Sequence, residues 1–171
     1  MAQKNNKLET NYITNHISSG GFIFYKDKKT KEIFTLLIKN RKGEYWIPKG
    51  HLEEGEDQVD AAYREIAEEI TLKKSQLKYV GFCSLIKYSF TENEAKNNKE
   101  VYINIFETLE KNKLTPRIGD IEVLDIEWFK YSDALQTISF NKEELTRSKE
   151  MYEKYLLGSN SWFRDFVLKR R

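Results

Sequence analysis

Residues 50–72 read GHLEEGEDQVDAAYREIAEEITL, a glycine-bounded loop that runs into a segment with helical periodicity. Within that segment Glu65, Glu68 and Glu69 have i, i+3 and i+4 spacing. A helix of 3.6 residues per turn therefore places the three carboxylates on one face. A second face carries apolar residues at helical spacing, namely Val59, Ala62, Ile66 and Ile70. We expect the apolar face to be buried and the acidic face to border water or a cleft.

The acidic face is the first candidate for a metal site. Like charges at i and i+4 destabilise an isolated helix by roughly 0.2–0.5 kcal/mol per pair, and a divalent cation between the carboxylates removes this repulsion. Paired glutamates on a helix are more often a solvated surface, so the acids alone do not decide between the two interpretations. The loop in front of the helix favours the metal site.

The loop and helix together resemble the Nudix box, Gly-x5-Glu-x7-Arg-Glu-U-x-Glu-Glu-x-Gly-U, in which U is aliphatic. Eight of its nine defined positions match, and the matching residues are Gly50, Glu56, Arg64, Glu65, Ile66, Glu68, Glu69 and Leu72. The one departure is Thr71, where the family has glycine. Because a β-branched residue adopts the left-handed helix end poorly, we expect the chain to leave this helix at an altered angle, with the site intact.

The resemblance spans roughly residues 18–156 and implies the α/β fold of the family, an α/β/α sandwich with a mixed sheet and helices on both faces. It also implies hydrolysis of a nucleoside diphosphate linked to another group, with Mg²⁺ or Mn²⁺ as cofactor. Glu68 and Glu69 would supply metal ligands. Glu65 would either share the metal or accept a proton from the attacking water, and both roles stay open.

Other box positions have supporting roles in the family. Arg64 and Glu56 would pair to hold the loop against the helix, and the Gly50 carbonyl would be a further metal ligand. From spacing alone, Arg64 is an i, i+4 ion-pair partner of Glu68, and both interpretations can hold. The family also uses a carboxylate outside the box. Glu122, six residues before Trp128, is the candidate, with Asp120 and Asp125 as alternatives.

The segment Trp46-Ile-Pro-Lys-Gly-His-Leu-Glu-Glu-Gly-Glu56 is similar to the diadenosine tetraphosphate hydrolases of the family. This similarity implies a nucleoside polyphosphate substrate, diadenosine tetraphosphate, cleaved to ATP and AMP. Lys49 would bind phosphate and His51 would donate a hydrogen bond. Trp46 is either a base-stacking platform or part of the core.

Basic and aromatic residues also alternate further along the chain, where Tyr88 and Lys99 are candidates for substrate binding. Trp46, Tyr88 and Tyr102 all stay open as the stacking platform. One alternative function is an RNA 5′-triphosphate pyrophosphohydrolase, although that group tends to have Gly-Gly where this chain has Gly-His. A second alternative, from another class, is a non-catalytic nucleotide-binding module. Retention of the box acids disfavours it.

Length and composition indicate the number of domains and the class of protein. The chain has 171 residues, 39% hydrophobic content and a net charge of +2, which predict one domain over residues 16–171 with C-terminal helices and a flexible polar leader over residues 1–15. There is no DNA-binding motif, no apolar stretch long enough to span a membrane and no signal segment, so we expect a cytoplasmic protein. The single cysteine, Cys83, lies in an apolar run and reads as a small core residue.

Periodicity predicts strands over residues 20–25, 33–38, 77–88, 101–108 and 121–129. It predicts a solvated loop over Thr91 to Lys99, which is rich in Glu, Asn and Lys. Two helices follow the last strand, one capped by Ser132 and a longer one that begins at Asn141 and ends at Gly158.

Overall fold

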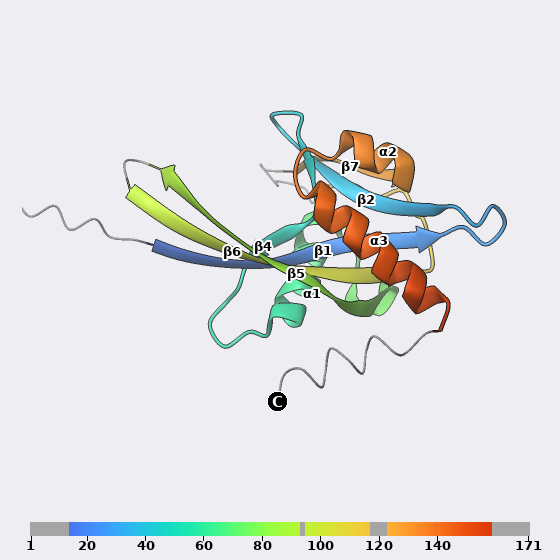
Figure 1. Cartoon of the computed structure of the whole chain (residues 1–171), viewed down its shortest axis with the longest axis horizontal. Helices are drawn as coiled ribbons and strands as arrows, with labels where there is room; N and C mark the ends of the chain where they lie inside the picture. Colours follow the sequence, from blue (N-terminus) through green and yellow to red (C-terminus); the bar gives the residue numbers. More distant parts are fainter. Residues whose placement is uncertain (1–13, 93–94, 117–122, 159–171) are drawn as a thin grey trace, which may run out of the picture.

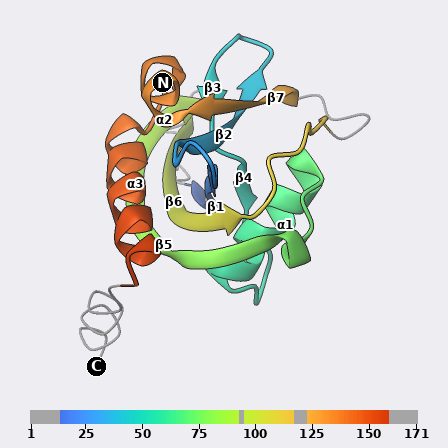
Figure 2. The same cartoon turned by 90° about the vertical axis from the view of Figure 1, so that its right-hand side faces the viewer.

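The computed structural model describes residues 14–92, 95–116 and 123–158 (Figure 1). The described chain forms a mixed sheet with helices on both faces, which confirms the predicted α/β class. Figure 2 shows α1 (Gln58–Ile70) and α3 (Lys142–Leu156) on opposite sides of the strands. No helix in these described ranges is long and apolar enough to cross a membrane.

The sheet is built around its first strand, and the main strand order is β3-β2-β1-β6-β5. The strands are β1 (Thr14–Lys26), β2 (Ile33–Asn40), β3 (Tyr45–Trp46), β4 (Lys49–His51), β5 (Leu77–Glu92), β6 (Ala95–Thr108) and β7 (Val123–Lys130). β1 runs parallel to β6 on one edge, while β4 and β2 share its other edge in antiparallel pairs. β7 pairs with β2. The loop that carries the box therefore joins the sheet directly through β4.

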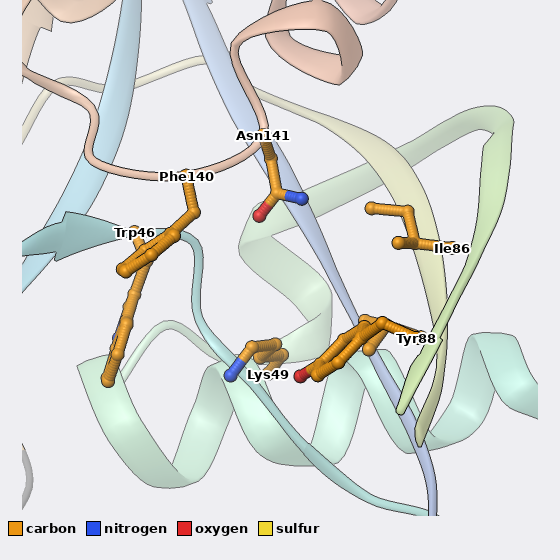
Figure 3. A pocket seen from close by; sticks show the side chains of 7 residues that line it. Trp46, Lys49, Ile86, Tyr88, Phe140 and Asn141 are labelled. Atoms are coloured by element: carbon orange, nitrogen blue, oxygen red, sulfur yellow. The ribbon is translucent and has the colours of Figure 1, made fainter. Parts of the chain in front are cut away.

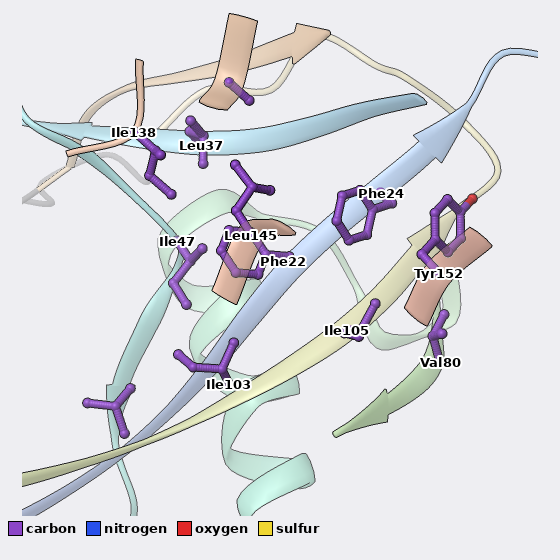
Figure 4. Packing of buried hydrophobic residues seen from close by; sticks show 12 residues of the cluster. Phe22, Phe24, Leu37, Ile47, Val80, Ile103, Ile105, Ile138, Leu145 and Tyr152 are labelled. Atoms are coloured by element: carbon purple, nitrogen blue, oxygen red, sulfur yellow. The ribbon is translucent and has the colours of Figure 1, made fainter. Parts of the chain in front are cut away.

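The two faces of β1 pack against different helices. Phe22 and Phe24 belong to the core cluster under α2 (Tyr131–Thr137) and α3, whereas Ile23 belongs to the cluster under α1. Alternation of side chains along a strand produces this division. The ring of Phe24 stacks on that of Tyr152 from α3, with 5.0 Å between the ring centres (Figure 4).

A close backbone approach in β1 positions the loop. A Cβ atom on Gly20 would lie 2.1 Å from the Pro48 carbonyl oxygen, so only glycine fits here. The next residue, Gly21, donates its N–H to the same oxygen at 3.2 Å. The segment that contains Lys49 and Gly50 is thus pressed against the central strand.

The expected loop from Thr91 to Lys99 was a wrong prediction. β5 continues to Glu92 and β6 begins at Ala95, so these strands form a long ribbon that projects from the body of the protein (Figure 1). Cross-strand pairs of polar side chains support the ribbon. Lys87 and Glu100 form an ion pair of 2.6 Å, and Ser89 donates to Asn98 at 2.8 Å.

The end of α1 also differs from expectation. Thr71 takes the left-handed conformation, with φ 61° and ψ 11°, so the helix ends with the conformation that a glycine would adopt. The predicted change of exit angle is therefore wrong. The backbone keeps its left-handed turn and Thr71 carries the conformational strain.

At other predicted boundaries the structure differs in detail. α2 begins at Tyr131 with Lys130 at its N-cap, two residues earlier than a Ser132 cap requires. Asn141 stands at the N-cap of α3 as predicted, but with φ 67° and without a side-chain capping bond. β1 begins at Thr14, so it includes the last two residues of the predicted leader.

Candidate active site

β4 and α1 meet at the contact between Gly50 and Glu65. A Cβ atom on Gly50 would lie 2.0 Å from Glu65 Oε2, so the carboxylate occupies the space that any side chain at position 50 would need. Asp57 caps α1 by accepting the Val59 N–H at 2.8 Å, which fixes where the helix begins. The Asp57 cap and the Gly50–Glu65 contact together fix the position of α1 relative to β4.

Arg64 holds the loop against the helix. Its guanidinium donates two parallel hydrogen bonds to Glu56, both 2.9 Å, and a third of 2.7 Å to the His51 carbonyl oxygen. The hydrogen bonds from Arg64 hold the pKa of Glu56 below its ordinary value, and those same bonds raise the pKa of Arg64. This is the geometry expected for the Arg64 and Glu56 pair, and it joins the loop to the helix at two points, Glu56 and the His51 carbonyl.

The three box acids differ in their surroundings. Glu65 is partly buried and accepts a 2.7 Å hydrogen bond from Arg64, and burial raises its pKa despite that bond. Glu69 accepts the backbone N–H of Lys49 at 3.0 Å. Glu68 is exposed, 3.6 Å from the guanidinium nitrogen that also contacts Glu65. One face of α1 thus carries three carboxylates in different surroundings. One is partly buried, one is bonded to a backbone N–H and one is exposed.

These donors suit a hard divalent cation. Mg²⁺ takes carboxylate, carbonyl and water oxygens, and Glu65, Glu68, Glu69 and the Gly50 carbonyl are of that kind. In the part of the chain that the structure describes, no three acidic, histidine or cysteine side chains converge on one point. Arg64 compensates part of the charge of Glu65 and Glu68, and a cation held by Glu68 would add to this compensation.

A pocket of about 490 Å³ opens beside the box loop, and most of its wall is aromatic or aliphatic (Figure 3). Its lining residues are Trp46, Lys49, Ile86, Tyr88, Val101, Phe140 and Asn141. Lys49 Nζ lies 4.8 Å from the centre of the Trp46 ring. Three of the predicted substrate residues, Trp46, Lys49 and Tyr88, therefore line one cavity.

The other two predicted substrate residues, His51 and Lys99, lie outside this pocket. Lys99 Nζ is 3.1 Å from His51 Nε2. Burial lowers the pKa of Lys99, and the charge of Lys49 lowers it further. Lys99 and Tyr88 help to line a second hollow of about 480 Å³ on the β5–β6 ribbon. Tyr88 thus lines both cavities.

The remaining aromatic and acidic candidates lie away from the aromatic pocket or outside the described residues. Tyr102 packs against Phe82 with 6.2 Å between ring centres and does not line either cavity described above. Glu122 and Asp120 lie outside the described residues. Asp125 is on β7 opposite Lys39, and its side chain accepts the N–H of Ile126 at 2.8 Å.

Sequence reasoning missed Phe140 and Asn141 as pocket residues. They belong to the connection between α2 and α3, almost a hundred residues from Trp46 in sequence, and only the fold brings them together. The one signal in the sequence was Phe140 itself, a large aromatic residue between two predicted helices, and it is 48% exposed.

Comparison with known proteins gives one family. A model of the NUDIX domain matches residues 14–153. An asymmetrical bis(5′-nucleosyl)-tetraphosphatase of Caenorhabditis elegans is 37% identical over 62 residues, which cover 36% of this chain and 45% of that protein. An RNA pyrophosphohydrolase of Pelagibacter ubique (strain HTCC1062) is 31% identical over 87 residues, 50% of this chain and 54% of that protein. The chain thus spans about half the length of these curated relatives.

Solved structures share the fold. An Ap4A (diadenosine tetraphosphate) hydrolase of C. elegans in a binary complex superposes with a TM-score of 0.60 at 19% identity, covering 84% of this chain and 98% of that one. The NUDIX domain of Shewanella oneidensis NrtR, complexed with ADP ribose, superposes with a TM-score of 0.58 at 15% identity, covering 88% and 94%. At these identities the likeness establishes the architecture alone.

Proposed function

Because the chain belongs to the NUDIX family, we propose that it is a metal-dependent pyrophosphohydrolase of nucleoside polyphosphates that cleaves diadenosine tetraphosphate to ATP and AMP. The family assignment rests on a domain match over residues 14–153. The choice of substrate rests on the pocket and on the nature of the relatives.

One observation carries the proposal, and it concerns Lys49. Its backbone N–H bonds to the box acid Glu69 at 3.0 Å, while its ammonium group lies in the aromatic pocket, 4.8 Å from the Trp46 ring centre. A single residue therefore links the acidic helix face to the cavity. A nucleotide with its base in the pocket would place its phosphates along Lys49 toward Glu69.

The glutamates of the box would have different roles in hydrolysis. Nudix hydrolases generally use divalent metal ions, and here Mg²⁺ or Mn²⁺ would neutralise phosphate charge and favour attack by water. Glu68, Glu69 and the Gly50 carbonyl would hold the ion. Glu65 has a raised pKa because it is partly buried, which suits a proton acceptor for the attacking water. Arg64 positions Glu65 through their 2.7 Å hydrogen bond.

The pocket supports a nucleoside as the bound group. A volume of about 490 Å³ is within the usual range of small-molecule sites, and its walls include Trp46, Tyr88 and Phe140. Aromatic side chains bind nucleobases by stacking, for about 1–3 kcal/mol per base. The relative at 37% identity is named a bis(5′-nucleosyl)-tetraphosphatase, which agrees with a substrate that carries a nucleoside on a long polyphosphate.

A second candidate is hydrolysis of an RNA 5′-triphosphate. The Pelagibacter ubique relative, at 31% identity over 87 residues, carries that activity in its name. The second hollow favours it too, since Lys87, Tyr88 and Lys99 extend the substrate surface along the ribbon. Many of its polar groups are bonded to one another, including Lys87 with Glu100 and Ser89 with Asn98. We therefore rank RNA second.

The test is a comparison of kcat/KM for diadenosine tetraphosphate, 5′-triphosphorylated RNA, an oxidised nucleoside triphosphate and ADP-ribose, each with Mg²⁺. Preference for the dinucleotide supports the proposal, and pyrophosphate release from RNA as the fastest reaction would replace it with the second candidate. Absence of turnover on all four would favour a nucleotide-binding module. Glu69→Gln serves as the inactive reference, and Asp60→Asn, at an exposed acid of α1 paired with Lys74, as the matched control.

A further inference from the structure

We propose that Asn141 selects adenine in the aromatic pocket. This inference rests on the proposed function, because it names the residue that recognises the base of the proposed substrate. Figure 3 shows the Asn141 carboxamide directed into the cavity, between Phe140 on one side and Ile86 on the other. The residue stands at the N-cap position of α3 but makes no side-chain capping bond, so its amide faces the pocket and not the helix.

The backbone holds Asn141 in that direction. Its φ of 67° and ψ of 35° are left-handed, a conformation in which asparagine is enriched and most other side chains are strained. An asparagine at a helix start ordinarily accepts an N–H from the first turn. Here the left-handed backbone turns the side chain away from that role and into the cavity.

The rest of the lining offers a base stacking surfaces and single neutral polar atoms, one on Tyr88 and one on Trp46. Trp46 and Phe140 form one wall, with 6.4 Å between their ring centres, and Tyr88 lies opposite them (Figure 3). Lys49 offers a cation suited to phosphate. Asn141 alone among the lining side chains offers a donor and an acceptor next to each other.

That pair matches the chemistry of adenine. An asparagine amide accepts from the adenine N6 amino group and donates to the adjacent N7, the usual pairing of this side chain with this base. The N7 edge of guanine presents two acceptors, and its N2 amino group would be buried against apolar walls such as Ile86 and Val101 without a partner. Adenine is favoured because both of its hydrogen bonds to the Asn141 amide are satisfied. Guanine is disfavoured because it would leave buried polar groups without a partner.

The experiment measures binding of AMP, GMP and IMP by calorimetry in EDTA, so that neither metal nor turnover contributes. The wild type should bind AMP about tenfold more tightly than GMP or IMP. Asn141→Asp replaces the amide donor with an acceptor, and Asn141→Gly removes the side chain, yet both residue types tolerate the left-handed backbone. Both variants should weaken AMP binding. Asn141→Gly should bring the three affinities within about twofold, whereas the aspartate variant still accepts from the adenine N6 amino group and should keep AMP the tightest of the three ligands.

The matched control is Lys31→Gly, another left-handed position with φ 63°, which lies in the turn after β1 and should leave the AMP to GMP ratio unchanged. An AMP to GMP affinity ratio that is equal to one in the wild type, or that survives Asn141→Gly, overturns the inference. Turnover of diadenosine tetraphosphate without base selection would leave the proposed function standing. Selective AMP binding without turnover of any polyphosphate would do the reverse.

Discussion

Gly50 and Glu65 pack so closely that a methyl group on Gly50 would come within 2.0 Å of the Glu65 carboxylate. The atoms in the way belong to the end of a flexible side chain, so the carboxylate can move aside. We therefore expect Gly50→Ala to leave the fold intact and to displace Glu65. kcat should fall by about 10²-fold, the effect of removing one proton-transfer group.

Gly43 provides the opposite case. It has φ 82°, and a methyl group added to it would meet nothing within 4 Å, so Gly43→Ala strains the backbone without touching the site. That variant should lose about 1 kcal/mol of unfolding free energy and keep its kcat. Steady-state kinetics and thermal unfolding of both variants separate the two effects. Equal kcat in Gly50→Ala and wild type would remove the Gly50 contact from the catalytic argument.

Glu65→Gln and Glu69→Gln should each lower kcat by about 10²-fold or more, because each substitution removes a metal ligand or a proton acceptor. Both retain the shape of the side chain, so circular dichroism should show an unchanged fold. Asp60→Asn neutralises another carboxylate on the same helix, at an exposed position bonded to Lys74. It should keep near-normal kcat. Full activity in both glutamine variants at saturating Mg²⁺ would show that the acidic face is not the site.

Hydrolysis should depend on Mg²⁺ or Mn²⁺, because an acidic helix face repels a phosphate anion until a cation reverses the local charge. EDTA should abolish turnover, and re-addition of Mg²⁺ should restore it. If Mg²⁺ binds the native state and not the unfolded chain, it also raises the melting temperature, which provides a second measurement. The shift with Mg²⁺ should be smaller in Glu69→Gln. Undiminished activity after chelation and dialysis into metal-free buffer would exclude a metal-dependent mechanism.

The sequence predicted the α1 region best. A 3.6-residue period and the box spacing located the helix and its acids, and the pairing of Arg64 with Glu56 appears as the resemblance implied. Strands that bury a continuous apolar run, such as β2, were equally clear. β3 and β4 were not, because strands of two and three residues contain too few positions for any period to show.

The wrong loop prediction has a physical cause, because pairing across the sheet overrode local preference. Thr91 to Lys99 is polar enough to suggest a loop, yet pairs such as Lys87 with Glu100 stabilise it as a ribbon. The pocket was beyond reach for a related reason. Phe140 and Asn141 meet Trp46 only through the packing of α2 and α3 against the sheet, which no local pattern encodes.

Thr71→Gly should stabilise the protein. Thr71 is exposed and left-handed at φ 61°, a conformation that penalises a residue with a Cβ by roughly 1–2 kcal/mol. Glycine removes this strain but adds about 0.4–1 kcal/mol of conformational entropy to the unfolded chain. The net gain of about 0.5–1 kcal/mol should raise the melting temperature by about 1–4 °C for a chain of this size.

Thr146 provides the control of opposite sign for that substitution. It lies inside α3 and bonds to the Lys142 carbonyl oxygen at 3.0 Å, so Thr146→Gly should destabilise the helix. Denaturant unfolding of both variants measures the two signs. A loss of stability in Thr71→Gly would mean that the strain at the end of α1 is relieved elsewhere.

Diadenosine tetraphosphate should be cut asymmetrically, giving ATP and AMP and not two molecules of ADP. In the proposed function Lys49 would hold the phosphate chain between the pocket and Glu69, so that the attacking water would meet one defined phosphorus. Lys49→Met keeps the backbone bond to Glu69 but removes the charge. Loss of one charge-assisted contact worth about 1.5–3 kcal/mol should raise KM roughly 10- to 100-fold, with a smaller change in kcat. Chromatography of the products checks the cleavage position. ADP as the main product of the wild type would show that the polyphosphate does not follow the path from Trp46 through Lys49 to the acids.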